Sequence, residues 1–474
     1  MLREFQVANF YSIHHAQRSS FALPGDGGEQ EGGVASKQGD SLTNCQIVLG
    51  ANASGKSNYL EALTFILWFI RDSWNHDPDQ SLPFSPFAFC HPLSDAAEFL
   101  LEVEHVASGS LYRYELAVTK KFVIRETLFR KQYGREWSCL FGREREENGD
   151  AQYVCHISEE IAPVTPDELL ANASFLSIRR RKSDPDFEEF FDLTHYISGV
   201  SLKKQYSPRV AAVAEEQLRL LLERGQDVSD KVISLLRKAG VGLHNICLGH
   251  DSERIQTHRD MLEQLKTQID MLEEKYDRIR QKAAHLVDPE VKKLRQELDY
   301  DVSDPRGIIG RSRMALEAGT AGLATLENDK TINVLYKIGN RTYQLPLEQE
   351  SDGVKAIAFL LPSLLEALRS GSIFIFDELE RSVHPLALPY IIELFTDRSI
   401  NSRNAQIICT THSVHLIREM NAYQILLVEK DDTMQTSIWR LGDMEGLEKE
   451  ENYLTRYMAG AYGGIPGGRL RGAG

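Results

Sequence analysis

The sequence is short of basic residues and has no long apolar stretch. It holds 54 Lys and Arg against 69 Asp and Glu in 474 residues, which gives a formal net charge of −15. A protein that coats DNA needs a net supply of cations, so this balance argues against bulk nucleic-acid binding and leaves room only for a local basic patch. The longest apolar run, Tyr59–Ile70, is about half the roughly 20 residues that span a bilayer, and it contains Glu61. We therefore expect no membrane segment.

Cysteine is also scarce and follows no metal-binding or redox pattern. No CxxC pair occurs among the six cysteines, which are Cys45, Cys90, Cys139, Cys155, Cys247 and Cys409. A chain of this length does not need disulfides to fold, so we expect buried thiols. The opening residues, MLREFQVANF, lack the charged and apolar regions of a secretory signal. Together these absences predict a cytoplasmic protein.

Composition divides the chain into three parts. Residues 1–165 combine short strands with a helical run, and within them residues 25–40 are Gly-rich and predict a mobile surface loop. Residues 98–158 repeat short strands separated by turn residues, which predicts an antiparallel meander. Residues 166–330 are helical and strongly charged, and residues 331–474 return to alternating strands and helices. These three parts predict an α/β fold interrupted by a helical insertion.

The helical part contains the clearest periodicity of the chain. Apolar positions recur every seven residues over 252–287, which predicts a coiled coil of about four heptads. The two rows are Ile255, Leu262, Ile269, Tyr276 and Ala283 and, offset by three, His258, Leu265, Leu272, Ile279 and Leu286. The pattern that follows, Val291 to Leu298, is too short to pair with the whole helix, so we seek its partner in Val210–Leu236 or in another chain. A long helix lying on its own domain is the alternative.

The strongest chemical signal is the phosphate-loop pattern GxxxxGK[ST] at Gly50–Ser57, between the apolar run Cys45–Leu49 and a helical pattern from Asn58 to Phe69. Glycines let successive N–H groups turn toward phosphate oxygens, and the helix N-terminus adds partial positive charge. Lys56 is predicted to reach the β- and γ-phosphates, and Ser57 to hold Mg²⁺. No NKxD guanine motif occurs, so ATP is preferred over GTP. The predicted nucleotide-binding residues here are Gly50, Asn52, Gly55, Lys56, Ser57 and Asn58.

A second pattern follows far along the chain. The apolar run Ile373–Phe376 ends in Asp377 and Glu378. A buried strand that ends in Asp can place that carboxylate in the Mg²⁺ shell beside Ser57, and the adjacent Glu can orient or deprotonate the attacking water. Such a strand is common by itself, and its pairing with the phosphate loop is what identifies it as the Walker B motif. Asp377 is therefore predicted to hold Mg²⁺, and Glu378 to be catalytic.

About two thirds of the chain separates the two motifs. A nucleotide fold split by a large helical insertion resembles the SMC, Rad50 and RecF types of head. The sequence is similar to the ABC-type ATPases often called AAA15 or OLD-like, over about residues 1–165 and 331–474. This resemblance implies the fold class, which is an α/β P-loop ABC-type ATPase head with an antiparallel β subdomain and a helical, coiled-coil insertion.

Two segments near the C-terminal half resemble further motifs of this family. Ser351-Asp352-Gly353 resembles the signature motif, which implies that Ser351 and Gly353 contact the γ-phosphate held by a second subunit. Asp352 departs from the transporter-type pattern, which has Gly there, and by itself the segment is equally a helix N-cap. His412 follows the apolar run Gln406–Thr410 and resembles the switch histidine that senses the γ-phosphate. The resemblance therefore adds His412 as a second catalytic residue.

Two other segments resemble the family without a chemical role. Residues 379–385 follow Walker B as the family's D-loop does, and His384 within them is expected to be structural. Residues 456–466 also look like the family, and no physical role follows from their sequence.

The resemblance also implies partners. Family members without a nuclease domain act in anti-phage defence as a sensor or scaffold for a separate effector, and the ATPase subunit of PARIS-type systems, with its Toprim-type nuclease partner, is similar. Only 44 residues follow Lys430, too few for a Toprim domain in this chain. We expect a homodimer or higher assembly, a separate effector that is a Toprim-type nuclease, and a phage protein as trigger. ATP state is then expected to control the effector.

The alternative hypothesis is a RecF- or SMC-like ATPase that clamps DNA in repair or chromosome maintenance. The local basic clusters Arg179–Lys182 and Lys203–Lys204, beside Phe175 and Tyr206, are either nucleic-acid contacts or solvated faces. The charge of −15 and the short coiled coil weigh against this clamp. An ABC transporter motor is disfavoured, because no coupling to a membrane is visible.

Overall fold

The computed structural model of the chain describes residues 1–24, 33–89, 96–146, 153–165, 168–199, 208–223, 230–238, 244–249, 252–284, 305–328, 330–381, 383–447 and 452–465. The chain divides into two units. Unit 1 contains residues 1–221, 227–242 and 351–474, and unit 2 contains residues 222–226 and 243–350.

The central sheet of unit 1 is mostly parallel and deeply buried. Its strand order is β12–β16–β17–β6–β18–β19, and only the β18–β19 pair is antiparallel. The strands are β6 (Cys45–Gly50), β12 (Tyr196–Gly199), β16 (Ile373–Phe376), β17 (Gln406–Thr410), β18 (Ile425–Lys430) and β19 (Thr436–Arg440). Every residue of β6, β16 and β17 is buried, as expected for parallel strands covered on both faces. The predicted buried strands are confirmed.

A second sheet of unit 1 is antiparallel, in the order β11–β10–β9–β8–β7–β1–β2. Its strands are β1 (Leu2–Ala8), β2 (Gln17–Ser20), β7 (Ala97–His105), β8 (Ser110–Val118), β9 (Val123–Lys131), β10 (Ser138–Arg145) and β11 (Tyr153–Ile157). Strands β7 to β11 pair consecutively, so the predicted meander is confirmed.

The Gly-rich loop predicted over 25–40 is wrong in part. Residues 33–35 form the strand β4 (Gly33–Ala35), which pairs with β5 (Ser41–Thr43) in a small sheet that also contains β3 (Ala22–Leu23). Val34 and Leu42 are buried together there with Met1. A single apolar residue in a Gly-rich stretch was therefore enough to anchor this part of the loop. Residues 25–32 lie outside the described part of the chain.

The helix α1 (Lys56–Asp72) occupies the main core of unit 1. Its buried residues include Leu63, Ile66 and Phe69, and they share one hydrophobic cluster with residues of both sheets. Such a helix is apolar around most of its circumference because both of its sides are covered. The arrangement fixes the N-terminus of α1, which carries Lys56, against the end of β6.

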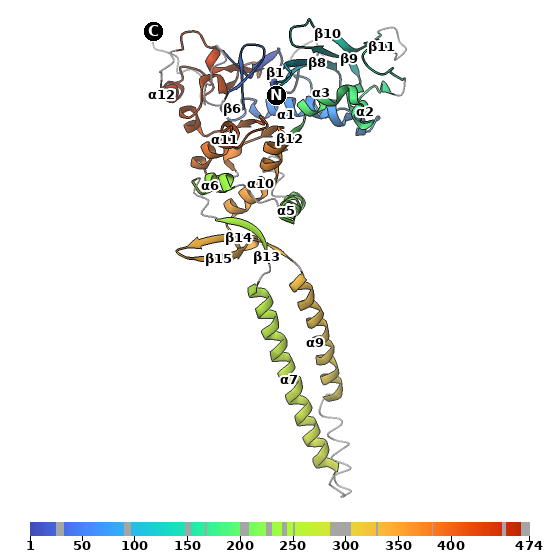
Figure 1. Cartoon of the computed structure of the whole chain (residues 1–474), viewed down its shortest axis with the longest axis vertical. Helices are drawn as coiled ribbons and strands as arrows, with labels where there is room; N and C mark the ends of the chain where they lie inside the picture. The colour runs from blue at the N-terminus through green and yellow to red at the C-terminus, as the bar shows by residue number, and fades with distance from the viewer. Residues whose placement is uncertain are drawn as a thin grey trace. The chain divides into compact units, whose positions relative to one another are not determined.

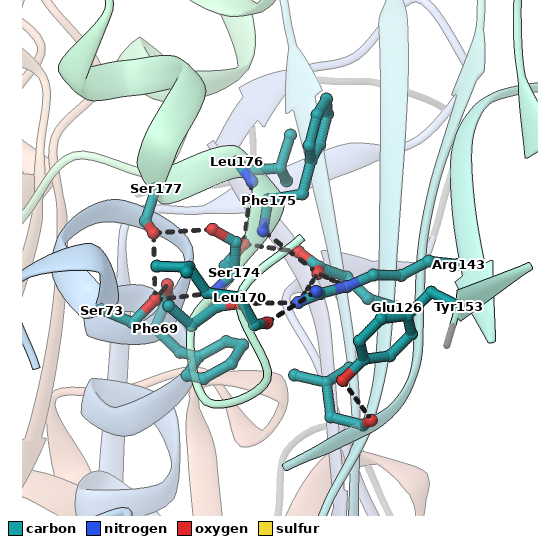
Figure 2. Close-up of polar contacts among 12 residues, drawn as sticks. Phe69, Ser73, Glu126, Arg143, Tyr153, Leu170, Ser174, Phe175, Leu176 and Ser177 are labelled. Carbon is teal, nitrogen blue, oxygen red and sulfur yellow. Dashed lines mark hydrogen bonds and ion pairs between the residues drawn. The ribbon is translucent and has the colours of Figure 1, made fainter. Parts of the chain in front are cut away.

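A fully buried ion pair fastens the chain after the meander onto the antiparallel sheet (Figure 2). Arg143 on β10 donates from Nε to Glu126 Oε2 on β9 at 2.8 Å, and both side chains have no exposed surface. Glu126 Oε1 also accepts from Tyr114 and Ser174, and Arg143 donates to Leu170 O. Charges removed from water need such complete pairing. The network therefore fixes residues 170–175, where the helix α2 (Phe175–Arg181) begins.

The insertion begins later than the predicted boundary at residue 166. Residues 168–199 form α2, α3 (Glu188–Leu193) and β12, and β12 pairs in parallel with β16. This segment therefore completes the central sheet of unit 1. β12 was not predicted, because four residues are too few for a periodicity signal.

The structure describes further helices in unit 1. They are α5 (Pro208–Glu223, whose last residues fall in unit 2), α6 (Asp230–Lys238), α10 (Asp352–Ser370), α11 (Leu388–Thr396) and α12 (Tyr453–Met458). Among the described residues, no helix combines the length and the apolar character needed to cross a bilayer. The expectation of buried thiols is confirmed for Cys45 and Cys409 and wrong for Cys139, Cys155 and Cys247, which are half-buried; Cys90 lies outside the described residues.

Unit 2 joins a small sheet to a pair of long helices (Figure 1). The sheet has the order β13–β14–β15 and contains β13 (Asn245–Gly249), β14 (Thr331–Ile338) and β15 (Arg341–Pro346). The predicted hairpin around Gly339 is confirmed, with Tyr336 opposite Tyr343. The predicted helix over 252–287 is confirmed as α7 (Ser252–Ala284), and residues 285–287 lie outside the described part.

The partner of α7 is the helix α9 (Pro305–Asn328) rather than residues 210–236. His258 Nε2 lies 3.1 Å from Gly319 O, and a Cβ at Gly319 would lie 2.6 Å from Leu262. A glycine in α9 therefore lets the two helices approach closely. Leu272, a predicted heptad position, is 41% exposed in the single chain. α9 was not predicted as the partner helix, because it is rich in small residues instead of heptad leucines. Only the short pattern at 291–298 was considered as a possible partner after α7.

Candidate functional site

The phosphate loop forms a tight turn where β6 meets α1. Gly50 ends β6, and a Cβ there would lie 2.3 Å from Val428 O and 2.7 Å from Ser54 Oγ. Gly55 has φ of 109°, and a Cβ there would lie 2.2 Å from Thr436 Oγ1. Both positions therefore require glycine, one because of space and the other because of space and backbone conformation. Asn52 is exposed at the outer end of the same loop.

Lys56 is held inside this loop. Its ammonium donates to Gly50 O at 2.9 Å and to Ala51 O at 2.8 Å. Burial lowers the pKa of Lys56, and the charges of Glu380, Asp377 and Glu378 oppose that shift. An ammonium has three N–H groups, so one stays available for an anion placed over the loop.

The two motifs meet at the N-terminus of α1. Ser57 Oγ donates to Asp377 Oδ1 at 3.2 Å, although the two residues are 320 positions apart. The same oxygen of Asp377 accepts from Thr410 Oγ1 at 2.5 Å. The contact crosses β17, which lies between β6 and β16. The structure thus brings together Lys56, Ser57 and Asp377.

Thr410 connects the two acidic residues and was missed by the sequence analysis. Its Oγ1 accepts a hydrogen bond from Glu378 N at 2.7 Å while donating to Asp377. Glu378 has a positive φ of 56°, which bends the chain sharply between the two carboxylates. The available signal was the position of Thr410 at the end of a buried strand. Because Phe376 pairs with Cys409, the residues that follow them, Asp377 and Thr410, must be neighbours.

We expect Thr410→Val to lower ATP hydrolysis at least about tenfold, because a hydrogen bond to a charged group contributes about 1.5–3 kcal/mol. Valine removes the donor to Asp377 and the acceptor for the Glu378 amide, with little change of volume. Steady-state phosphate release measures the effect. Thr410→Ser keeps the hydroxyl and is the matched control, so equal losses in both variants would contradict this role.

The donors at this point fit Mg²⁺. Ser57 Oγ and the Asp377 carboxylate are hard oxygen donors 3.2 Å apart, and Mg²⁺ takes one or two carboxylates together with substrate phosphates instead of an all-protein cage. Consistently, the described residues contain no group of three or more His, Cys, Asp or Glu that could hold a metal ion by themselves.

His412 lies two residues after Thr410, beyond the end of β17. It is exposed, and its backbone N–H donates to Glu380 Oε1 at 2.8 Å. The other oxygen of Glu380 is buried without a hydrogen-bond partner. Glu380 therefore links the segment after Walker B to the segment after β17. Glu380 lies in the segment that resembles the D-loop, and no role was predicted for it.

A second polar network supports the opposite side of the loop. Asn58 Nδ2 donates to Ser12 Oγ at 2.6 Å, and Ser12 Oγ lies 2.7 Å from Thr436 Oγ1. Thr436 in turn donates to Ser54 O at 2.9 Å. This network places the predicted residue Asn58 in a supporting position. Ser12 and Thr436 carry no sequence signal, because only the packing of β19 and the loop after β1 brings them here.

Ser351 and Gly353 lie at the start of the helix α10. Ser351 is the N-cap of α10, and its side chain accepts from Val354 N at 3.4 Å. Both residues are exposed, and a Cβ at Gly353 would meet nothing within 4 Å. Within one chain, this segment is therefore a helix cap with an open surface around it.

The basic cluster Arg179–Lys182 is largely neutralised by acids of the same chain. Arg179 is buried and pairs with Glu168 and Asp184, at 2.7 and 2.9 Å. Arg180 pairs with Asp72, Lys182 pairs with Glu168, and Arg181 lies over the ring of Trp74. Phe175 is fully buried. The pairing favours a structural role for this cluster over nucleic-acid contact. Lys203, Lys204 and Tyr206 lie outside the described residues.

Comparison with known proteins gives one family match and several distant structural similarities. Residues 47–418 match the family described as "AAA domain, putative AbiEii toxin, Type IV TA system". No curated protein matches the chain. The SMC head domain from Thermotoga maritima is 12% identical, covers 93% of this chain and 98% of that one, and gives a TM-score of 0.37. The Smc head domain with an extended coiled coil bound to the C-terminal domain of ScpA, from Pyrococcus furiosus, is also 12% identical, with coverages of 93% and 96% and a TM-score of 0.32. The recombination mediator protein RecF with ATPrS is 14% identical, with coverages of 92% and 98% and a TM-score of 0.24.

TM-scores between 0.24 and 0.37 support no conclusion about the activity or the partners of this chain. The sheet order, the glycine-lined loop at the start of α1 and the contact of Ser57 with Asp377 define the fold without them. The family match spans more than half of the chain and includes both motifs. The chain therefore belongs to the AAA_21 family of AAA-domain proteins and has an α/β P-loop fold.

Proposed function

We propose that the protein binds ATP with Mg²⁺ and hydrolyses it to ADP and phosphate. The observation that carries this proposal is the contact between Ser57 and Asp377, with Glu378 held by Thr410 beside it. A phosphate loop by itself binds anions. The additional carboxylates at the same point supply what hydrolysis requires, namely a metal position and a base for water.

Each residue has a distinct part in this reaction. The backbone N–H groups of the loop and the third N–H of Lys56 bind and orient the phosphates. Ser57 and Asp377 would hold Mg²⁺, which neutralises the charge that develops on the transferred phosphoryl group. Glu378 orients the attacking water and accepts its proton. His412, exposed at the end of β17, donates a hydrogen bond to the terminal phosphate.

We further propose that two copies of the chain enclose ATP, with Ser351 and Gly353 of one copy completing the site of the other. A residue that completes a site in a second subunit must be exposed in the single chain, and Ser351, Gly353 and Asn52 are all exposed. Ser351 at the N-terminus of the 19-residue helix α10 also offers the partial positive charge that favours a phosphate.

The biological role that we propose is a nucleotide-dependent sensor or scaffold in anti-phage defence. In this role a phage protein acts as trigger, and the ATP state controls a separate effector, a Toprim-type nuclease. The family description supports this direction, because it names a toxin of a toxin–antitoxin system, a class of protein that acts together with a second gene product. The alternative of a DNA clamp is disfavoured, because basic residues of the cluster 179–182 already form ion pairs with acidic residues of the same chain.

Co-purification with the products of neighbouring genes tests this role. The tagged chain is isolated with ATP, with a non-hydrolysable analogue and without nucleotide. We expect a nuclease partner whose retention depends on the nucleotide, and no such dependence for Lys56→Ala. A chain that purifies alone in all three states would overturn the proposal. ATP hydrolysis stimulated by DNA and falling with salt would instead favour the clamp.

A further inference from the structure

The segment after β19 ends in a tight, glycine-rich turn that the site described above does not use. It comprises α12 and residues 459–465, and Gly460, Gly463 and Gly464 all have φ between 71° and 80°. A Cβ at Gly463 would lie 2.7 Å from Glu429 Oε2 and 3.0 Å from Trp439. The glycines are therefore required both by backbone conformation and by the close approach of the turn to β18 and β19.

Two side chains hold this turn in place. Gly464 N donates to Glu429 Oε2 at 3.0 Å, and Tyr457 Oη donates to Gly464 O at 2.9 Å. Burial raises the pKa of Tyr457 to about 12. Glu429 belongs to β18, whose Val428 carbonyl also faces Gly50. The same strand end thus supports the turn and the start of the phosphate loop.

The turn, the loop and the segment after β17 line a pocket of about 400 Å³. Its walls are residues 49–52 of the loop, His412 and Val414 after β17, and Tyr457, Met458 and Ile465 of the C-terminal segment. The helix α12 also packs on the 3₁₀ turn Val414–Arg418, directly after His412. Lys56, the predicted ligand of the β- and γ-phosphates, donates to Gly50 and Ala51 in the wall of this pocket. The pocket therefore adjoins the end of the loop where the terminal phosphate is expected.

We propose that residues 453–465 position His412 for hydrolysis, with Glu429 and Tyr457 as the positioning residues. This inference rests on the proposed ATPase function. The segment forms the third wall of a pocket whose other walls carry Asn52 and His412. Lys56 and residues 53–57, where the loop meets the N-terminus of α1, do not line that pocket. Loss of the turn should therefore affect turnover and leave ATP affinity unchanged.

Substitution of Glu429 tests the inference in the full chain. Glu429→Ala removes the acceptor for Gly464 N, and we expect kcat to fall about tenfold while the Kd of a fluorescent ATP analogue changes less than about twofold. Glu429→Gln keeps a carbonyl oxygen as acceptor and should restore most of kcat. Tyr457→Phe, which keeps the ring and removes only the hydroxyl, should lower kcat in the same direction.

Hydrogen–deuterium exchange supplies a readout that does not depend on activity. In Glu429→Ala we expect faster exchange at residues 411–414 without nucleotide, and unchanged exchange in the meander. If exchange and kcat both stay at the wild-type level, the positioning role is wrong. If kcat and ATP affinity fall together, the segment is merely structural, which also overturns the inference. A wild-type chain that binds ATP without hydrolysing it would refute the proposed function itself, and the exchange result would still decide whether the turn holds the segment that carries His412.

Discussion

Glu378→Gln is expected to lower ATP turnover by about 10²–10⁴-fold and to leave ATP binding intact, because the loss of a general base removes proton transfer and nothing that binds phosphate. The amide has nearly the shape of the carboxylate, so the backbone bond from residue 378 to Thr410 should persist. Since binding survives while hydrolysis stops, the ATP-bound dimer should accumulate.

Two measurements check this expectation. Phosphate release gives turnover, and size-exclusion chromatography with light scattering gives the fraction of dimer with and without ATP. Lys56→Ala is the contrasting variant, because it removes the buried ammonium and should abolish ATP binding and dimer formation together. Hydrolysis by Glu378→Gln at the wild-type rate would show that another residue is the base.

Glu126→Gln is expected to destabilise unit 1 by about 3–5 kcal/mol, because breaking a buried ion pair leaves an uncompensated charge in the core. Arg143 has no exposed surface and cannot reach water when its partner is neutral. The new amide group would also face the Ser174 hydroxyl and Phe175 N–H, which both donate to Glu126 (Figure 2). The loss should therefore exceed that of an ordinary hydrogen bond.

Urea unfolding followed by tryptophan fluorescence measures this loss in the intact chain. All four tryptophans lie in unit 1, so the signal reports that unit. Glu366→Gln is the matched control, because its pair with Arg369 is exposed and should contribute only about 0–1 kcal/mol. A double variant, Glu126→Leu with Arg143→Met, should recover part of the stability. Equal effects of Glu126→Gln and the control would show that the buried charge is compensated elsewhere.

Local sequence patterns predicted most of the fold. The apolar runs before Gly50 and Asp377, the spaced strands of the meander and the hairpin around Gly339 depend on neighbours in the sequence, and all of these elements are present. The phosphate loop was predictable for the same reason, since its glycines, lysine and serine act within eight consecutive residues. Roles that depend on a second copy of the chain, such as those of Ser351 and Gly353, stay predictions.

Predictions failed where an element depends on distant partners. Four residues at β12 carry too little periodicity to reveal a strand, and pairing with β16 alone makes them one. The partner of α7 was sought among apolar heptads, but α9 packs through Gly319 and other small residues. The basic cluster at 179–182 looked available for nucleic acid because Glu168, Asp184 and Asp72 approach it only in the folded chain.

The sequence by itself predicted the chemistry of this protein. The two features that carry this prediction are the phosphate loop at Gly50–Ser57 and the acidic strand end at Asp377–Glu378. It could do so because residue type and short spacing alone specify how a loop binds phosphate. Only the tertiary structure decided which other groups serve that chemistry. Thr410 reaches Asp377 because β17 lies beside β16, and Tyr457 and Glu429 fix a turn beside the loop because β18 lies beside β6. Strand order brings these residues together, and strand order is set by long-range packing that no local pattern encodes.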